Sequence, residues 1–408
     1  MKILLLTQLF QPEPTFKGLP FAQALTDRGH TVEVLTGFPN YPGGQVYQGY
    51  RIRPWQREIL GGIRVNRVAL YPSHDRSGFR RMLSYLSFAL ACLLMGPWLV
   101  DKPDVIYVYN LVTLGPAAFL LRRLYGAKVI LDVTDLWPDS VGSSGMLRGG
   151  ISFHALATVS TWVYRHVDWL TVVTPGYKRV LVDRGVCAGR IELIYNWCNE
   201  NAERPAPRDE RLAQELGFVG HFNILYAGAM GVLQGLDTVL DAAQICRSYM
   251  PEVQFVLVGS GVDRGRLESR TAEMGLTNVR FLPRQAPEAM GALYALADAL
   301  LVHLKDDPLF RITIPSKTQA YLYMGRPIIM AMEGDAADLV RLAGAGLVCP
   351  SQNPVSLAEA VVQLAELADE ERERIGQAGK KFYVDNMAMQ VGIDRFAQRM
   401  QILTERIN

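Results

Sequence analysis

Short apolar runs alternate with longer segments of helical periodicity along the chain. The runs are continuously apolar, as expected for strands that are buried on both faces of a parallel sheet. In the first half, the pattern predicts strands at residues 2–7, 31–36, 63–68, 104–109, 128–133, 169–173 and 191–195, with helices near 21–28, 114–125, 151–166 and 176–184. In the second half, it predicts strands at 222–227, 253–258, 279–282, 299–304 and 327–332, each followed by a helix, and closing helices at 356–367, 370–383 and 390–407. The interval 37–62, rich in Gly, Pro, Tyr and Asn, is predicted to be a long loop.

A polar segment at 196–220, which contains Pro205 and Pro207, interrupts this alternation and is typical of a linker. We therefore predict an α/β protein with two Rossmann-like, doubly wound parallel-sheet domains that face a cleft. The predicted domains cover residues 1–200 and 201–385, and a C-terminal helix at 386–408 is expected to pack back toward the first domain. Ligands of such sheets bind beyond the carboxyl ends of the strands, so the loops that follow strands are the candidates for chemistry.

The segment 82–100 is a separate question, because it contains no charged residue and is just long enough to span a bilayer. Arg80 and Arg81 precede it, and Asp101 and Lys102 follow it. Ser84, Ser87 and the pair Gly96-Pro97 dilute its apolar character. A membrane span, a half-buried helix that touches the lipid surface and an ordinary core helix all remain open.

Composition narrows the class of protein. Of the 408 residues, 49% are hydrophobic and 20% are charged, which is typical of a globular protein and excludes extended disorder, collagen and coiled coil. The formal net charge of +2 gives no reason to expect a nucleic acid partner. Five scattered cysteines without a C-x-x-C pair, and six scattered histidines, indicate a reducing cytosol and no metal site. The apolar N-terminus is too short for a secretory signal and is predicted to be the first strand.

The loop after the first predicted strand, residues 8–18, is not a G-x-G-x-x-G dinucleotide loop. Its Gly18 would allow a ligand to approach the backbone, although a tight turn onto a helix explains it equally well.

The loop after the predicted strand 128–133 gathers two carboxylates and an indole, from Asp135, Trp137 and Asp139. Such a set suits a sugar, because an aromatic face packs on C–H groups and carboxylates accept hydrogen bonds from hydroxyl groups. Helix capping by Asp139 or Ser140 is the alternative for part of the loop, but Asp135 lies outside it. Asn110 ends the neighbouring strand and is expected to face the same cleft.

Two glycine-rich loops follow strands in the second half. The loop at 228–235, which includes Gly231, joins a strand to a helix and is predicted to offer backbone N–H groups to a phosphate. The next loop begins at Gly259 but has Arg264 where a dinucleotide fingerprint needs its third glycine. It is therefore predicted to be a turn that lines the cleft.

The most informative segment is 310–317. Lys317 falls in the first turn of a predicted helix, where a cation opposes the helix dipole, and a bound anion would explain it. Arg311 lies just before this helix, Ser316 lies at its start, and Arg284 ends another strand at the same edge. A solvated lysine is the alternative.

On these motifs the chain resembles the retaining glycosyltransferases of family 4, which have the GT-B fold, and is closest to the branch of colanic acid and O-antigen fucosamine transferases. The resemblance covers nearly the whole chain in the right order. The matching segments are 28–36, 39–43, 135–139, 196–197, 226–228, 234–237, 307–310 and 314–317, followed by Tyr321 and Gly325.

The resemblance implies a nucleotide-diphosphate sugar donor, UDP-linked, on the C-terminal domain. It implies a lipid-linked saccharide acceptor on the N-terminal domain, peripheral contact with the cytoplasmic face of the membrane, retention of configuration, and no metal or cofactor. Asp135 and Lys317 would be the catalytic residues, and Asn110, Trp137 and Asp139 would bind the acceptor. The donor would be held by Gly18, Gly231, Gly259, Arg284, Arg311, Thr313, Ile314 and Ser316, with uracil near Arg284 and the diphosphate on the amides of Thr313 and Ile314.

The sequence also departs from the family. Ile312 and Ala320 stand where the family commonly has two glutamates, Gln234 stands where many members have lysine, and the double glycine of the first loop is reduced to Gly18. The second glutamate usually holds the ribose hydroxyls, which alanine cannot do. A catalytically degenerate scaffold that binds sugar nucleotides is therefore the alternative function. A sugar-nucleotide epimerase is a third possibility, but the sequence lacks a histidine and carboxylate set for proton abstraction.

Overall fold

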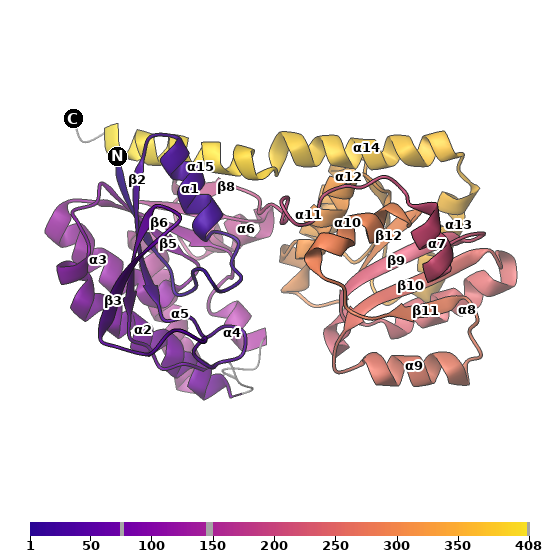
Figure 1. Cartoon of the computed structure of the whole chain (residues 1–408), viewed down its shortest axis with the longest axis horizontal. Helices are drawn as coiled ribbons and strands as arrows, with labels where there is room; N and C mark the ends of the chain where they lie inside the picture. Colours follow the sequence, from indigo (N-terminus) through magenta and orange to yellow (C-terminus); the bar gives the residue numbers. More distant parts are fainter. Residues whose placement is uncertain (74–76, 144–149, 406–408) are drawn as a thin grey trace. The chain divides into compact units, whose positions relative to one another are not determined.

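In the computed structural model, which describes residues 1–73, 77–143 and 150–405, the chain divides into two compact units. The first unit comprises Met1–Ile194 and Ile393–Asn408, and the second comprises Tyr195–Gly392. Each unit contains a sheet of mostly parallel strands with helices packed against it, so the predicted α/β class and doubly wound architecture are confirmed (Figure 1).

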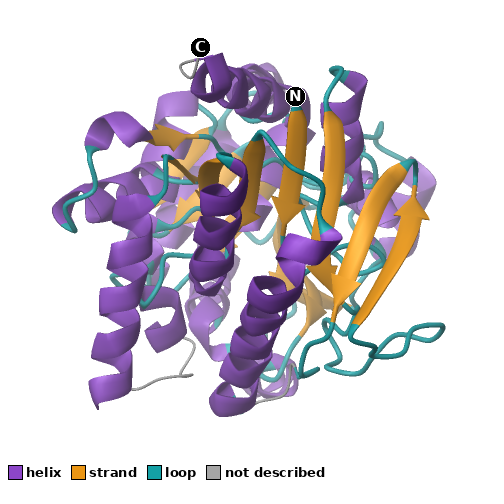
Figure 2. Ribbon diagram, turned by 90° about the vertical axis from the view of Figure 1, so that its left-hand side faces the viewer, coloured by secondary structure: helices purple, strands orange, loops and turns teal. Residues whose placement is uncertain are grey.

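Within its described residues, the first unit has an eight-stranded sheet in the order β3-β4-β2-β1-β5-β6-β7-β8. Its central strands are apolar and buried on both faces, because helices cover the sheet (Figure 2). The strands are β1 (Lys2–Leu6), β2 (Thr31–Gly37), β3 (Trp55–Leu60), β4 (Ile63–Val68), β5 (Val105–Tyr109), β6 (Lys128–Val133), β7 (Trp169–Val172) and β8 (Ile191–Leu193). The helices are α1 (Leu19–Asp27), α2 (Gly78–Leu99), α3 (Gly115–Tyr125), α4 (Asp139–Ser143), α5 (Gly150–His166) and α6 (Pro175–Asp183), with 3-10 turns η1 (Val112–Leu114) and η2 (Ala188–Arg190).

The prediction of an uninterrupted loop from 37 to 62 is wrong. Residues Trp55–Leu60 form β3, which pairs antiparallel with β4. Gly61 and Gly62, both at positive φ (52° and 82°), make the tight turn between the two strands. A Gly-Gly pair between two short runs is a hairpin signal, but the Gln, Arg and Glu side chains of β3 hide the apolar pattern of this edge strand.

The second unit has a six-stranded parallel sheet within its described residues, in the order β11-β10-β9-β12-β13-β14. The strands are β9 (Phe222–Ala229), β10 (Val253–Ser260), β11 (Val279–Leu282), β12 (Ala299–His303), β13 (Ile328–Ala331) and β14 (Gly346–Cys349). The helices are α7 (Glu210–Leu216), α8 (Asp237–Tyr249), α9 (Arg264–Glu273), α10 (Pro287–Ala295), α11 (Ser316–Met324), α12 (Asp335–Ala343), α13 (Pro354–Glu366) and α14 (Asp369–Asn386), with turns η3 (Val232–Gln234) and η4 (Phe310–Ile312). A continuous core of β9, β10, α8 and α13 side chains, including Phe255 and Val361, supports the sheet.

The segment predicted to be a linker is structured instead. Residues from Tyr195 onward belong to the second unit, and α7 forms within the predicted linker. Glu200 fixes this stretch, because its carboxylate accepts hydrogen bonds from the Tyr383 hydroxyl (2.6 Å) and the Met389 amide (2.7 Å). The prolines therefore mark an irregular but packed connection.

The last helix, α15 (Met389–Glu405), contributes its residues from Ile393 onward to the first unit. Phe396 packs edge-on against Phe21 and Tyr107, and Arg399 pairs with Glu192. The N-terminus and the end of this helix lie on the same side of the first unit (Figures 1 and 2).

Candidate active site

The carboxyl end of the second unit's sheet holds Lys317, which lies in the first turn of α11. Its Nζ atom lies over the ring of Tyr226 on β9, 3.6 Å from the ring centroid. A Cβ atom at Gly228 would lie only 3.1 Å from this Nζ, so the glycine leaves room for the lysine side chain. The ammonium group therefore rests on an aromatic face at the end of a central strand.

The electrostatics of Lys317 are unusual, because protein atoms enclose its ammonium group. Burial lowers the pKa of Lys317 to about 7. No carboxylate among residues 1–73, 77–143 and 150–405 forms an ion pair with it. An anion beside the ammonium group would favour its charged form, so this position suits an anionic ligand.

The amide of Gly231, predicted to be bare, is occupied. Its N–H donates to Oε1 of Gln234 at 3.0 Å, so the residue that replaces the family's lysine holds the loop closed. The backbone carbonyl of Gln234 lies 2.6 Å from Nδ1 of His303 at the end of β12.

His303 is a residue that the sequence analysis missed. It is fully buried, its Nε2 atom has no hydrogen-bond partner within the described residues, and burial lowers its pKa, with a smaller effect from Lys317. A histidine that ends an apolar strand gives no sign in the sequence of being enclosed, because the enclosing loop at 231–235 comes from a different part of the chain.

Gly259 and Arg284 differ in their surroundings. A Cβ atom at Gly259 would lie 1.9 Å from the carbonyl oxygen of Gly228, and φ is 146°, so this glycine lets the ends of β9 and β10 approach each other. Arg284 is exposed in the loop after β11, where its position agrees with the expected strand end.

One prediction for the segment before α11, that the Thr313 amide binds the diphosphate, is wrong in this structure. Arg311 is exposed and donates two hydrogen bonds of 2.8 Å from its guanidinium group to Asp306, and its donor-binding role stays a prediction. The amide of Thr313 is not free, because it donates to the carbonyl of Phe310 at the end of η4 (3.2 Å). The amide of Ile314, by contrast, has no hydrogen-bond acceptor among the described residues, and Ser316 is exposed at the start of α11.

In the first unit, the structure brings Asn110 and Asp135 together at the ends of the adjacent strands β5 and β6. The Nδ2 atom of Asn110 donates to Asp135 Oδ2 (2.7 Å), and the Asp135 amide donates to Asn110 Oδ1 (2.8 Å). Asn110 has a φ of 66°, a conformation that costs energy for most residues and is found at functional sites. Although Asp135 is exposed, crowding by protein atoms raises the pKa of its carboxylate, and the bond from Asn110 opposes this shift.

The prediction that Trp137 binds the acceptor is wrong for this structure, whereas the acceptor-binding role of Asp139 stays a prediction. Trp137 is only 3% exposed and packs edge-on against Tyr85 of α2, so its ring is not available to a sugar. The carboxylate of Asp139 is engaged by the guanidinium group of Arg184. Both residues fix the loop and thereby hold Asp135 in position.

Gly18 also has a structural explanation. A Cβ atom there would lie 2.3 Å from Oε1 of Gln11, whose side chain accepts a hydrogen bond from the Leu19 amide at the start of α1. The glycine therefore makes room for this cap, and the alternative of a turn onto a helix is confirmed.

Two buried charges in the same loop were not predicted from the sequence. Lys17 is fully buried and pairs with Asp132 on β6, which also accepts hydrogen bonds from Tyr107 and Thr171. Glu13 accepts hydrogen bonds from the amides of Asn40 and Tyr41. These contacts connect the loop to strands and loops far away in the sequence, so no local pattern announces them.

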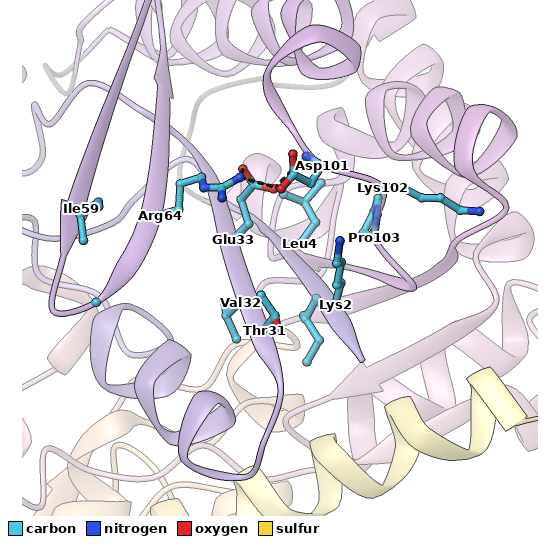
Figure 3. Close-up of a pocket in the computed structure, with 12 residues that line it drawn as sticks. Lys2, Leu4, Thr31, Val32, Glu33, Ile59, Arg64, Asp101, Lys102 and Pro103 are labelled. Carbon is cyan, nitrogen blue, oxygen red and sulfur yellow. Dashed lines mark hydrogen bonds and ion pairs between the residues drawn. The ribbon is translucent and has the colours of Figure 1, made fainter.

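A pocket lies at the opposite, amino end of the first unit's sheet, lined by residues such as Lys2, Glu33 and Arg64. Arg64 bridges Glu33 and Asp101 there (Figure 3). Because ligands of doubly wound sheets bind at the carboxyl end, we do not assign the chemistry to this pocket. Across the residues that the structure describes, no three His, Cys, Asp or Glu side chains gather as a metal-binding group.

Comparison with known proteins agrees with this architecture. Residues 19–197 match the family described as glycosyl transferase 4-like domain, and residues 221–367 match glycosyl transferases group 1. The chain is 29% identical over 346 residues to WcaI of Escherichia coli K12, named for colanic acid biosynthesis, with 82% of this chain and 84% of WcaI covered.

Solved structures share the fold at low identity. HepE of Anabaena, in complex with UDP, has a TM-score of 0.72 at 16% identity and covers 98% of this chain and 100% of its own. Sucrose-phosphate synthase of Thermosynechococcus elongatus has a TM-score of 0.69 at 17% identity, with 99% of both chains covered. Together with the two family matches, these similarities show that the chain has the GT-B fold and belongs to family 4 of the glycosyltransferases.

Proposed function

We propose that the protein is a retaining glycosyltransferase of surface polysaccharide or O-antigen biosynthesis. It transfers a sugar from a UDP-linked donor, bound by the second unit, to a lipid-linked saccharide, bound by the first. Lys317 carries the proposal, because its enclosed ammonium group has no anionic partner within the described residues and would gain one from a diphosphate. The name of WcaI and the UDP complex of HepE support this choice of pathway and donor.

On the donor side, the leaving diphosphate gains negative charge as the glycosidic bond breaks. In this proposal, the ammonium group of Lys317 and the Ile314 amide, next to the N-terminus of α11, would stabilise this charge. Each charge-assisted hydrogen bond contributes about 1.5–3 kcal/mol. We propose that these protein groups take the place of a metal ion, and turnover in the presence of a chelator tests that part.

On the acceptor side, Asp135 would accept a hydrogen bond from the attacking hydroxyl group. Asn110 holds one oxygen of the carboxylate, which leaves the other for the acceptor. Because the pKa of the Asp135 carboxyl group is raised, its carboxylate is a stronger base and hydrogen-bond acceptor than that of an unperturbed aspartate. With a lipid-linked acceptor, the enzyme would work in the cytoplasm, as a peripheral protein at the inner face of the membrane.

The alternative is a scaffold that binds sugar nucleotides without turnover. It is favoured by Ala320, which is buried on α11 and provides no carboxylate for the ribose hydroxyls. Ile312, in η4, likewise provides none. Mass spectrometry of a donor panel with lipid-linked acceptors separates the two functions, since only an enzyme forms the extended product.

Calorimetric titration with UDP and with uridine tests the donor site. Lys317→Met should weaken UDP binding about 10- to 100-fold, the loss of one charge-assisted contact, and leave uridine binding unchanged. Lys380→Met is the matched control, because Lys380 packs near Gly325 at the opposite end of α11. Binding of UDP to Lys317→Met at wild-type affinity would contradict the proposal.

Asp135→Asn tests the acceptor side. It preserves the shape of the side chain but removes its charge, so transfer should fall about 100-fold or more while UDP affinity stays at the wild-type value. An equal loss of transfer and of UDP affinity would mean that Asp135 acts on the donor or on folding instead.

A further inference from the structure

Helix α2 carries a row of exposed apolar side chains, which we call the apolar stripe. The residues recur every three or four positions and therefore share one face of the helix. They are Phe79, Leu83, Leu86, Leu90, Leu94 and Trp98. Phe79 and Trp98, near the two ends, are 77% and 84% exposed, which is exceptional for large aromatic side chains.

The opposite face of α2 is packed into the first unit. Ser84, Phe88, Cys92 and Gly96 are buried, and the Nε2 atom of Gln8 donates to the Ser84 hydroxyl at 3.1 Å. A Cβ atom at Gly96 would lie only 3.5 Å from a Leu35 methyl group, so the helix lies close against the sheet. The packing fixes α2 to the protein and leaves the apolar stripe facing outward.

This arrangement bears on the three alternatives for residues 82–100. In the described part of the chain, α2 is the one helix long and apolar enough to cross a membrane. To cross it, however, the helix would have to leave the sheet and break the buried bond between Gln8 and Ser84. A core helix would not expose six large apolar side chains. A helix that lies in the lipid surface is consistent with both the packed face and the exposed apolar face of α2.

Charge around the apolar stripe favours an anionic lipid surface as its partner. No Asp or Glu occurs from residue 77 to 100, and Arg80 and Arg81 lie at the N-terminal end of the helix. Asp101, just beyond the C-terminal end, is paired with Arg64. The hydroxyl group of Tyr125 donates to the carbonyl of Pro97, which brings the end of α3, with exposed Arg123, beside the C-terminal end of α2. Leucines between terminal aromatic residues, flanked by arginines, are typical of helices in the interface between headgroups and acyl chains.

We propose that α2 docks flat on an anionic lipid bilayer, with the apolar stripe in the outer acyl region and the flanking arginines at the lipid phosphates. This deepens the proposed function and rests on it only for the lipid-linked nature of the acceptor. Tyr85 of the same helix packs against Trp137, 5.6 Å between ring centroids, in the loop that carries Asp135. Docking would therefore bring the acceptor-binding loop close to the surface that holds a lipid-linked saccharide.

Flotation of the full chain with vesicles tests the proposal without substrate or turnover. The wild type should float with vesicles of phosphatidylcholine and phosphatidylglycerol, and less with phosphatidylcholine alone, with binding that weakens as salt rises. Leu90→Glu should lower the vesicle affinity at least about tenfold. Leu342→Glu, at a 73% exposed leucine on α12 of the second unit, is the matched control and should bind as the wild type does.

Three results would overturn the proposal. They are absence of flotation with the anionic vesicles, equal flotation of Leu90→Glu and the wild type, and retention of the protein in membranes after an alkaline carbonate wash, which would indicate a span. A change of sedimentation mass in Leu90→Glu with unchanged vesicle binding would assign the stripe to a second copy of the chain instead. UDP titration of the same preparations keeps the two proposals apart, because loss of UDP binding with intact flotation would overturn only the proposed function.

Discussion

Each unit surrounds the ammonium group of a lysine near the N-terminus of a helix, and the two lysines differ in their partners. Lys17 of the first unit pairs with Asp132, and Tyr107 and Thr171 also donate to this carboxylate. Lys317 of the second unit faces the ring of Tyr226 and has no carboxylate partner in the described part of the chain. The charge of Lys17, whose partner belongs to the protein, stabilises the fold. The charge of Lys317, which has no such partner within the described residues, can instead be neutralised by an anionic ligand.

The largest effect expected from this difference is on stability. Lys17→Met leaves Asp132 buried without its cation, which should lower the free energy of unfolding by about 3–5 kcal/mol. Lys317→Met removes a charge that the fold does not neutralise, so it should not destabilise the protein. Urea unfolding of the two variants, followed by circular dichroism, measures both changes.

The double variant Lys17→Met/Asp132→Asn controls for lost packing. It removes both charges, so it should be more stable than Lys17→Met alone. If Lys17→Met and Lys317→Met were equally stable, the distinction between a structural and a ligand-binding lysine would be wrong.

A second prediction concerns protons. Because the pKa of Lys317 is lowered to about 7, its amine is mostly neutral above that pH in the free protein. A bound diphosphate would raise this pKa, so UDP binding at about pH 8 should be accompanied by the uptake of close to one proton. At about pH 6 the amine is already protonated, so Lys317 should take up almost no proton. Calorimetry in buffers of different ionisation enthalpy counts the protons.

The variant Lys317→Met is the control for this measurement, because protons exchanged by UDP itself remain while those of the lysine disappear.

The same lowered pKa of Lys317 has a consequence for stability. An unfolded lysine titrates near 10.4, so between about pH 7 and pH 10 the unfolded chain binds more protons than the native protein. The stability of the wild type relative to Lys317→Met should therefore rise with pH in this window. Proton uptake by Lys317→Met equal to that of the wild type would exclude Lys317 from the binding site.

Sequence patterns predicted the fold better than the site, and the reason is the range of the interactions. Buried parallel strands such as β5 and β6 are continuously apolar, so they are visible one at a time. The edge strand β3 was missed because half of its surface faces water and its residues are polar. Asn110 and Asp135 were predicted to share a cleft, because the ends of adjacent parallel strands lie side by side.

Partners that tertiary packing selects could not be predicted. Arg311 pairs with Asp306, only five residues away in the chain, whereas Trp137 was expected to be exposed but packs against Tyr85 on α2. Neither the pairing of Lys17 with Asp132 nor the absence of a described partner for Lys317 can be read from neighbouring residues. Residue type and position on a strand end indicate a candidate, and only the packing decides whether its charge is already neutralised.

The smallest effect on stability and transfer is expected from substitutions at Asn110. This residue is the neutral partner of Asp135, the charged group of the first unit that, like Lys317, has no oppositely charged partner within the described residues. Asp135 carries a crowded carboxylate whose described partner is the neutral amide of Asn110. Asn110→Ala removes this bond and leaves at a φ of 66° a residue that, unlike asparagine, has no polar side chain to offset the cost of this conformation, so it should cost about 1 kcal/mol of stability and weaken transfer more than UDP binding. Asn110→Gly is the matched control, since glycine adopts positive φ freely but also lacks the bond. If the glycine variant regains stability but not transfer, the hydrogen bond to Asp135 matters for the reaction and the backbone conformation matters for the fold. Recovery of both would mean that Asn110 serves only to turn the chain, and that Asp135 needs no partner to hold the acceptor.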